Sequence, residues 1–158
     1  MNDRYLFKAK RTDNGEWVEG NLVWSYDADD DYKAIIIPTT NSNMFTEGGA
    51  RGDLGFENWC RVDTSTICQC TGLKDKNGKL IWENDIVKSF NGIGDECSIS
   101  KIVFTEEYSL SLGWCTEGIK SLLKYDKRVF SVGFKERDAK KSEVIGNIFD
   151  NPELLEVE

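Results

Sequence analysis

The sequence predicts a mainly β protein, and three observations support that class. Runs of β-branched and aromatic residues recur roughly every 8 to 12 residues, with turn-forming residues between them. The chain has 14 glycines but only 2 prolines, and it carries 5 Trp, 5 Tyr and 8 Phe. Aromatic side chains favour strands, and glycine favours the tight corners that join them. With 158 residues, the chain can form one domain or two small ones.

The first predicted element is an N-terminal β-hairpin. Residues 5–11 form its first strand and residues 16–25 its second. The intervening residues 12–15 end in an Asn-Gly pair, which favours a tight hairpin turn. Gly20 interrupts the apolar pattern of the second strand, which indicates a bulge there.

The next predicted strand covers residues 32–38 and contains three consecutive isoleucines, whose stiff side chains suit a buried pleated surface. Residues 39–58 are rich in Thr, Asn and Gly and have no hydrophobic period, so we expect a long loop that is either functional or mobile. Residues 59–71 return to strand, with a break at residues 63–65.

The clearest local signals lie in residues 71–88. Asn77-Gly78 predicts a tight turn, and the apolar residues 80–82 follow it. A polar step, Glu83-Asn84-Asp85, then precedes a strand that begins at Ile86. This order of turn, apolar run, polar corner and strand is typical of a small, tightly cornered β structure.

The remaining segments continue the β pattern, with two short helical exceptions. Residues 97–104 and 143–149 are predicted strands, and apolar residues alternate at 110–114 and again at 130–134. Residues 118–124 fit one helical turn, because Ile119, Leu122 and Leu123 lie three and four positions apart. Residues 135–142 form a charged connection. Pro152 begins a short C-terminal helix with Asn151 as its N-cap.

Together these elements indicate a barrel or sandwich in two regions. Residues 1–70 form an N-terminal β region that includes the hairpin and the loop at about residues 39–58. Residues 71–158 form a barrel-like region that ends in the short helix, and its five strand segments suggest a small SH3-like barrel. The pattern leaves open whether the two regions share one hydrophobic core.

Charge and hydropathy limit the environment and the partners. The formal net charge of −8 disfavours binding to nucleic acid, and we interpret it as surface charge for solubility rather than as DNA mimicry. A modest basic cluster at Lys120, Lys124, Lys127 and Arg128 leaves a nucleic-acid-binding module as an alternative. We expect no secretion signal and no membrane-spanning helix, and hence a location in the bacterial cytoplasm.

Cysteine and histidine content restrict the chemistry. The chain has no histidine, which excludes Ser-His-Asp and Cys-His catalysis within one chain. The chain has 5 cysteines, and an odd number cannot all form disulfides within one chain. We therefore expect reduced, buried thiols. Cys68 and Cys70 are one residue apart, too close for a zinc knuckle. The aspartates at 27, 29, 30 and 31 have ligand chemistry suited to Ca²⁺ but do not fit an EF-hand. We therefore expect no metal and no cofactor.

Three segments resemble the YopX family of bacteriophage and prophage proteins. The first combines Tyr5-Leu6-Phe7-Lys8-Ala9 with the return Trp17-Val18-Glu19-Gly20. The second runs from residues 62–66 into 71–78 and 83–87, and the third covers residues 143–155. Trp82 and Asn84 depart from the tyrosine and glycine usual at that corner, but asparagine tolerates left-handed backbone angles, so the corner can be kept. The resemblance implies a phage or prophage origin, action in the cytoplasm and self-assembly, and it supplies no catalytic residues.

The residue patterns leave several functions open. The leading hypothesis is a non-enzymatic accessory protein that self-associates and binds a host or phage protein, with Trp82, Glu83 and Asp85 as a speculative interaction surface. The alternatives are a small carboxylate-based enzyme or small-molecule binder near Glu83 and Asp85, and the nucleic-acid-binding module. Five tryptophans could stack bases or hold a peptide, but we expect most of them in the core.

Overall fold

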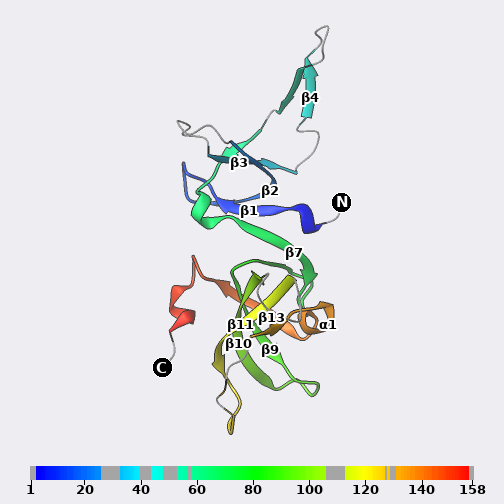
Figure 1. Cartoon of the computed structure of the whole chain (residues 1–158), viewed down its shortest axis with the longest axis vertical. Helices are drawn as coiled ribbons and strands as arrows, with labels where there is room; N and C mark the ends of the chain where they lie inside the picture. The colour runs from blue at the N-terminus through cyan, green and yellow to red at the C-terminus, as the bar shows by residue number, and fades with distance from the viewer. Residues whose placement is uncertain are drawn as a thin grey trace. The chain divides into compact units, whose positions relative to one another are not determined.

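The computed structural model describes residues 3–25, 33–39, 44–47, 53–56, 58–105, 113–126, 128 and 131–156 (Figure 1). These residues contain thirteen strands and only short helices, so the mainly β prediction is confirmed. Arg4–Gln69 forms one compact unit, and Cys70–Glu158 makes up the main part of a second. The sequence-based division between residues 70 and 71 falls within strand β7, Cys68–Lys74.

The N-terminal unit is an antiparallel sheet in the order β6-β3-β2-β1, followed by the first residues of β7. Its strands are β1 (Phe7–Lys10), β2 (Trp17–Trp24), β3 (Ala34–Pro38) and β6 (Cys60–Arg61). The predicted hairpin joins β1 to β2, and Gly15 at its turn has the positive φ of 73° that glycine favours. A short 3₁₀ helix, Asp3–Tyr5, precedes β1.

Gly20 has a different role from the bulge that the sequence indicated. It pairs in regular register with Phe7 on one side and Pro38 on the other. A Cβ atom at this position would lie 2.1 Å from the carbonyl oxygen of Ile37. Glycine is therefore required here because β3 approaches β2 closely, and the strand itself stays regular.

The core of the N-terminal unit consists of Ala9, Ala34, Ile36 and Val62, all buried. An antiparallel bridge between Arg11 and Val62 connects the segment after β1 to the segment after β6. Because β6 also pairs with β3, this bridge makes the four-stranded sheet curl around the buried residues. A 3₁₀ helix, Thr64–Thr66, fills the predicted break at residues 63–65 before β7 begins.

Residues 39–58 contain a hairpin where the sequence predicted only a loop. Strand β4 (Met44–Glu47) pairs antiparallel with β5 (Asp53–Phe56). Each short strand contains a phenylalanine, a residue type that favours strands, even though neither strand is long enough to show a clear period. The other residues of 39–58, apart from Thr39 and Asn58, lie outside the described parts of the chain.

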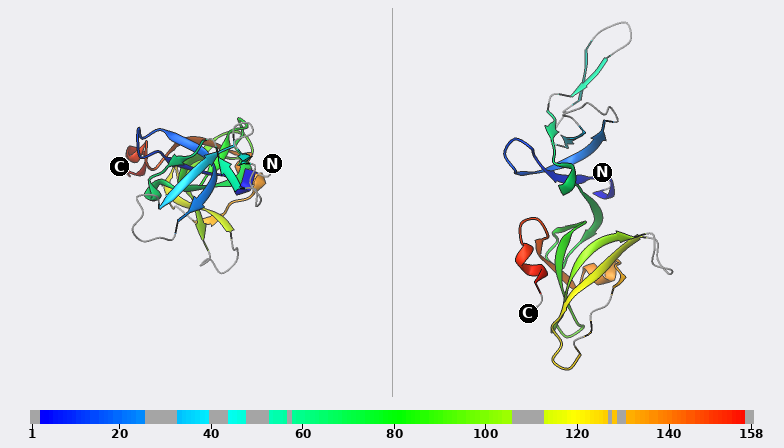
Figure 2. Two further views of the ribbon diagram at one scale, coloured as in Figure 1. Left: turned by 90° about the horizontal axis from the view of Figure 1, so that it is seen from above. Right: turned by 60° about the vertical axis from the view of Figure 1, so that its left-hand side comes forward.

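The C-terminal unit contains a five-stranded antiparallel sheet in the order β12-β11-β10-β9-β13. Strands β9, β10, β11 and β13 are labelled in Figure 1, and Figure 2 shows the ribbon in two further views. Its strands are β9 (Asp85–Phe90), β10 (Glu96–Thr105), β11 (Gly113–Ser121), β12 (Val132–Gly133) and β13 (Ser142–Asn147). In the described residues no pairing joins β12 to β13, so the sheet is open and does not form the closed SH3-like barrel that the sequence suggested. The later part of β7 pairs separately with β8 (Leu80–Trp82).

One local prediction in this unit was wrong. Residues 118–121 belong to β11 and do not form a helical turn, because β10 supplies hydrogen-bonding partners along this stretch. The charged connection at residues 135–142 joins β12 to β13 and contains helix α1 (Glu136–Ala139). Asp138 accepts a hydrogen bond from the backbone N–H of Lys135 at 3.1 Å, which caps the start of this helix.

A second cluster of buried apolar residues forms the core of the C-terminal unit. It contains Ile81, Val87, Ile102, Phe134 and Ala139. Ala139 brings α1 into this cluster, and Ile81 brings in β8. Each unit thus has its own cluster of buried hydrophobic residues. The sequence had left open whether the two regions share one core.

The C-terminal segment forms a single 3₁₀ turn, Pro152–Leu155. Asn151 precedes it as predicted, but its side chain makes no capping hydrogen bond to the turn. Its Oδ1 atom instead accepts from the backbone N–H of Asn147 at 3.4 Å.

Candidate functional site

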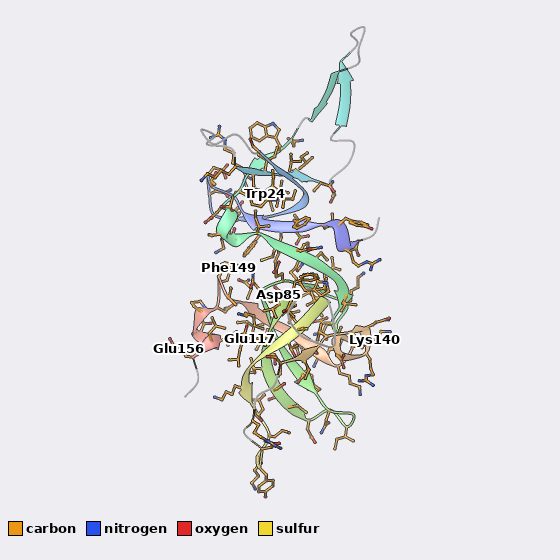
Figure 3. All side chains as sticks on the ribbon, in the orientation of Figure 1. Trp24, Asp85, Glu117, Lys140, Phe149 and Glu156 are labelled. Atoms are coloured by element: carbon orange, nitrogen blue, oxygen red, sulfur yellow. The ribbon has the colours of Figure 1, made fainter. Side chains whose placement is uncertain are left out.

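The corner between β8 and β9 holds the three residues that the sequence selected as an interaction surface. Trp82 is 4% exposed, and Asp85, which is labelled in Figure 3, is 2% exposed. The Oδ2 atom of Asp85 accepts the backbone N–H of Trp82 at 2.9 Å, which fixes the corner. Glu83 is half-buried, so it is the member of the three that retains appreciable contact with solvent. A role for this corner in binding stays a prediction.

The backbone of Asn84 shows how the corner keeps its shape with asparagine in place of the family's usual glycine. Its φ of 64° lies in the left-handed region, as expected for a residue type that accepts it. Its backbone N–H donates to the carbonyl of Ile102 at 2.9 Å, and its carbonyl accepts from Ile148 at 3.1 Å. These contacts connect the corner to strand β10 and to the end of β13.

Part of the basic cluster is neutralised by an acidic neighbour. Arg128 donates from Nε to Oδ1 of Asp126 at 2.9 Å and from Nη2 to Oδ2 at 2.7 Å. The hydrogen bonds from the Arg128 side chain and then from its backbone lower the pKa of Asp126 to about 2. The Nζ atom of Lys124 lies 5.2 Å from the ring centroid of Tyr125. Lys127 lies outside the described residues.

The described residues offer no preformed metal centre. Within them, no three His, Cys, Asp or Glu side chains are arranged so that they could hold a metal ion. The aspartates at 27, 29, 30 and 31 lie outside the described ranges. All five cysteines are free, and Cys68, Cys70 and Cys115 are buried.

The tryptophans are less buried than the sequence led us to expect. Only Trp82 is buried, while Trp24 is 48% exposed and Trp59 is 44% exposed. Trp17 is half-buried, and the Nζ atoms of Lys8 and Lys10 lie 5.1 and 5.5 Å from its ring centroid. Trp114 packs edge-on against Phe104, with ring centroids 5.2 Å apart.

An open hollow of about 580 Å³ lies on the N-terminal unit, near Arg11, Lys33 and Asp63. Its charged groups are largely occupied by local partners. Arg11 donates from Nε to Asp13 at 3.0 Å, and Asp63 accepts from both the backbone N–H and the hydroxyl of Ser65, at 2.9 and 2.7 Å. The bonds from Ser65 lower the pKa of Asp63. These groups stabilise the turns that carry them and do not converge on a shared point.

A cleft on the C-terminal sheet has more of the properties of a binding site. It consists of two adjoining cavities of about 200 and 240 Å³. Both cavities are lined by Ser98, Ser100, Thr116 and Val132. Six hydroxyl side chains from four strands line the cleft as a whole: Ser89, Ser98, Ser100, Thr116, Ser121 and Ser142.

The strand register brings these hydroxyls together. Ser89 of β9 is directly opposite Ser98 of β10 on one side and Ser142 of β13 on the other. Ser98 is also opposite Ser121 of β11. Residues directly opposite each other in antiparallel strands project from the same face, so one end of the sheet carries a hydroxyl surface. The hydroxyl oxygens of Ser89 and Ser98 are 2.7 Å apart and share a hydrogen bond.

Most of the other hydroxyl protons in the cleft are committed to backbone carbonyls. Thr116 donates to the carbonyl of Val132 at 3.3 Å, and Ser142 donates to that of Asp138 at 2.8 Å. Ser121 donates to the carbonyl of Asp126. Ser100 is 6% exposed, and the described residues provide no hydrogen-bond partner for its hydroxyl.

The walls and rim of the cleft combine apolar and charged groups. Val87, Phe90, Val132 and Phe134 provide apolar surface. Asp138 and Lys141 lie at one cavity, and the Asp126–Arg128 pair lies at the other. The described lining residues therefore carry equal numbers of positive and negative side chains.

The outer edge of β11 borders the same cleft. β12 pairs with β11 only at Cys115 and Thr116. From Glu117 to Ser121, the last five residues of this strand, the described residues provide no strand neighbour on that side (Glu117 is labelled in Figure 3). Exposed apolar side chains lie close to this edge in the chain: Leu123 (42%), Tyr125 (90%) and Val132 (56%).

No motif in the sequence directly indicated this cleft. Its serines are scattered over four strands, and serine in a strand has no distinctive spacing. The alternation Ser98-Ile99-Ser100 was the one local signal, because it places two hydroxyls near one another on the strand. Their meeting with Ser89, Thr116 and Ser142 depends on strand pairing.

The fold is that of a mainly β protein of two small units, one of which carries a hydroxyl-lined cleft beside an open strand edge. A model of the YopX protein family matches residues 6–156. The chain therefore belongs to the YopX family, as its three sequence segments indicated. No curated protein matched the sequence.

A solved structure is similar over nearly the whole chain. It is the crystal structure of protein EF1440 from Enterococcus faecalis, which is 26% identical in sequence with a TM-score of 0.55. The match covers 95% of this chain and 96% of that one. In the described parts of the present chain, no helix combines the length and the apolar character needed to cross a bilayer.

Proposed function

We propose that this chain is a non-enzymatic accessory protein of a bacteriophage or prophage, which works in the host cytoplasm by binding a protein partner and by self-association. Membership of the YopX family supports the phage or prophage origin. The observation that carries the proposal is the outer edge of β11, where residues 117–121 lack a neighbouring strand among the described residues. Such edges pair readily with a strand from another chain.

An interface also needs apolar surface to bury, and residues near this edge supply it. Leu123, Tyr125 and Val132 expose between 42% and 90% of their surfaces, and burying them against a partner would be favourable. The opposite edge of the sheet is already covered, because the backbone N–H of Lys76 donates to Ser142 at 2.9 Å and Asp75 accepts from Val144 at 3.1 Å. Among the described residues, the β11 edge is thus the more available of the two.

The same edge supports self-association. Two copies that pair their β11 edges antiparallel would form a closed dimer with twofold symmetry. Light scattering of the full chain at micromolar concentration tests this part directly. We expect a dimer for the natural sequence, and a strictly monomeric protein would contradict it.

Edge variants test the interface itself. Val132→Lys and Leu123→Lys place a charge beside the edge, which opposes strand addition. Ile93→Lys is the matched control, because Ile93 is 86% exposed in the turn between β9 and β10. We expect the edge variants, but not the control, to reduce dimer formation and to lose the proteins captured by the natural sequence from induced host cells. Equal recovery with all variants would show that this edge is not the interface.

A further inference from the structure

We propose that the hydroxyl-lined cleft of the C-terminal unit binds a neutral, polyhydroxylated small molecule of about the size of a monosaccharide. This inference concerns a ligand and does not depend on the protein–protein interaction proposed above. It rests on the volume of the cleft, on the hydrogen-bonding state of its hydroxyls, and on its balance of charge.

The hydroxyl of Ser100 has no hydrogen-bond partner among the described residues. Ser100 lines both cavities and is 6% exposed, and no described residue hydrogen bonds with its side chain. Because no described side-chain oxygen or nitrogen is both fully buried and without a partner, the Ser100 oxygen retains contact with the space of the cleft, where a polar group from outside the chain can hydrogen bond with it. Ser100 can both donate to and accept from such a group.

The other hydroxyls determine what that group must offer. The hydroxyl protons of Thr116, Ser121 and Ser142 are donated to backbone carbonyls, so their oxygens can only accept further hydrogen bonds. A ligand in the cleft must therefore supply several donors. Hydroxyl groups on a sugar-like ring meet this requirement, whereas a carboxylate or phosphate ion offers acceptors only.

The charge of the lining also favours a neutral ligand. Arg128 is held by Asp126 through two hydrogen bonds, of 2.9 and 2.7 Å. Asp138 caps α1 through Lys135, and its Oδ1 lies 3.7 Å from Nε of Arg137. Lys141 also lines the cleft, so the described lining carries two positive and two negative side chains and has no net charge that would select an ion.

Size and apolar surface complete the description. Each cavity, at about 200 and 240 Å³, has the volume of roughly seven or eight water molecules. This is sufficient for one small ring and too little for a drug-sized ligand. The apolar side chains of Val87, Phe90 and Val132 can contact the C–H face of such a ring, while the hydroxyls contact its rim.

The test is an NMR titration of the ¹⁵N-labelled full chain with D-glucose, D-galactose, D-ribose and myo-inositol. We expect at least one of them to bind with a Kd on the order of millimolar and to shift amide signals of residues that line the cleft. D-gluconate, an anion of similar size, should cause no such shifts. The absence of shifts with every neutral probe at tens of millimolar (a cleft that holds only water) would overturn the proposal, and so would equal shifts with gluconate.

Variants of the cleft sharpen the result. Ser100→Ala should weaken the binding of that probe about fivefold, which corresponds to the loss of one hydrogen bond. Ser65→Ala, in the N-terminal unit, is the control and should bind as the natural sequence does. If Ser100→Ala does not give a folded amide spectrum, Thr116→Val removes another cleft hydroxyl at nearly constant volume. Unchanged binding by the folded cleft variant would contradict the proposal.

Discussion

At the scale of single residues, Asp75 connects two parts of the C-terminal unit. It is 5% exposed, and its Oδ1 atom accepts from the backbone N–H groups of Asn77 and Lys79 at 2.8 and 2.9 Å. Its Oδ2 atom accepts from the backbone N–H of Val144 in β13 at 3.1 Å. The carboxylate thus fixes the tight turn and also holds that turn against the sheet.

Another turn in this unit shows why a carboxylate is needed. Asn91 accepts from the backbone N–H groups of Ile93 and Asp95 through its single Oδ1 atom, at 3.0 and 2.8 Å. An amide oxygen is therefore sufficient to form a turn of this kind. What an amide cannot do is accept from Val144 with its other atom, because that atom is an N–H donor.

We predict that Asp75→Asn keeps the turn but destabilises the C-terminal unit by about 2 kcal/mol, because two N–H donors would then face each other in a buried place. Urea unfolding of the full chain measures the loss, and hydrogen exchange at Val144 reports it locally. The exposed Asp95→Asn serves as the control and should change stability by less than about 0.5 kcal/mol. If both variants were equally stable, the hydrogen bond from Val144 to Asp75 would not contribute to the stability of the unit.

At the scale of elements, the close pairing of β2 with β3 depends on the missing side chain at Gly20. The atoms that a Cβ would meet are backbone atoms, at 2.1 Å for the oxygen and 2.7 Å for the carbon of the Ile37 carbonyl group. Backbone atoms cannot rotate away as a side chain could. The strands would therefore have to separate, and Ile36, which is buried in the core, would move with β3.

We predict that Gly20→Ala destabilises the N-terminal unit by about 3 kcal/mol or more, through strain and lost pairing. Hydrogen exchange of β2 and β3 amides should detect it. Gly15→Ala provides the comparison, because its site is open and only its φ of 73° opposes a side chain. That variant should cost about 1 kcal/mol. A Gly20→Ala protein as stable as Gly15→Ala would show that the two strands can separate without loss.

Local signals in the sequence predicted the elements that depend on neighbouring residues. The Asn-Gly pairs placed two hairpin turns correctly, and Asn84 was expected at a left-handed corner because of its own side chain. Residues 118–124 show where such signals end. The spacing of Ile119, Leu122 and Leu123 fits a helix, but Lys120 pairs with Ile99, which lies far away in the sequence. A short apolar spacing contains no information about that partner.

The cleft could not have been predicted either, because it depends on strand partners that lie far apart in the sequence. Its hydroxyls are contributed by four strands, and the register of three strand pairs brings them to one place. The residues that the sequence selected, Trp82 and Asp85, were noticeable because they lie in a strong local pattern. That pattern encodes a corner, and forming the corner is what makes both side chains buried.

At the scale of the whole molecule, the chain has two clusters of buried hydrophobic residues, one in each unit. Ile36 is fully buried in the first and Ile102 in the second. Replacing either with alanine would leave a cavity in one unit, and such changes typically cost about 2 to 5 kcal/mol.

We predict that Ile36→Ala lowers hydrogen-exchange protection in the N-terminal unit and leaves the sheet of the C-terminal unit unchanged, and that Ile102→Ala does the reverse. The double variant should show the sum of the two effects, because distant and independent sites are additive. Loss of protection in both units from either single change would instead mean that the two units unfold as one.

The continuity of the N-terminal unit in the chain has a consequence for biosynthesis. All of its strands lie between Arg4 and Gln69, and the last pairing that it requires joins Phe7 to Gln69. Once this segment has left the ribosome, every strand that the N-terminal unit needs is present, and most of the second sheet has not yet been made. We therefore expect the N-terminal unit to fold during translation, and a stalled nascent chain that exposes Gln69 should already resist protease within this region.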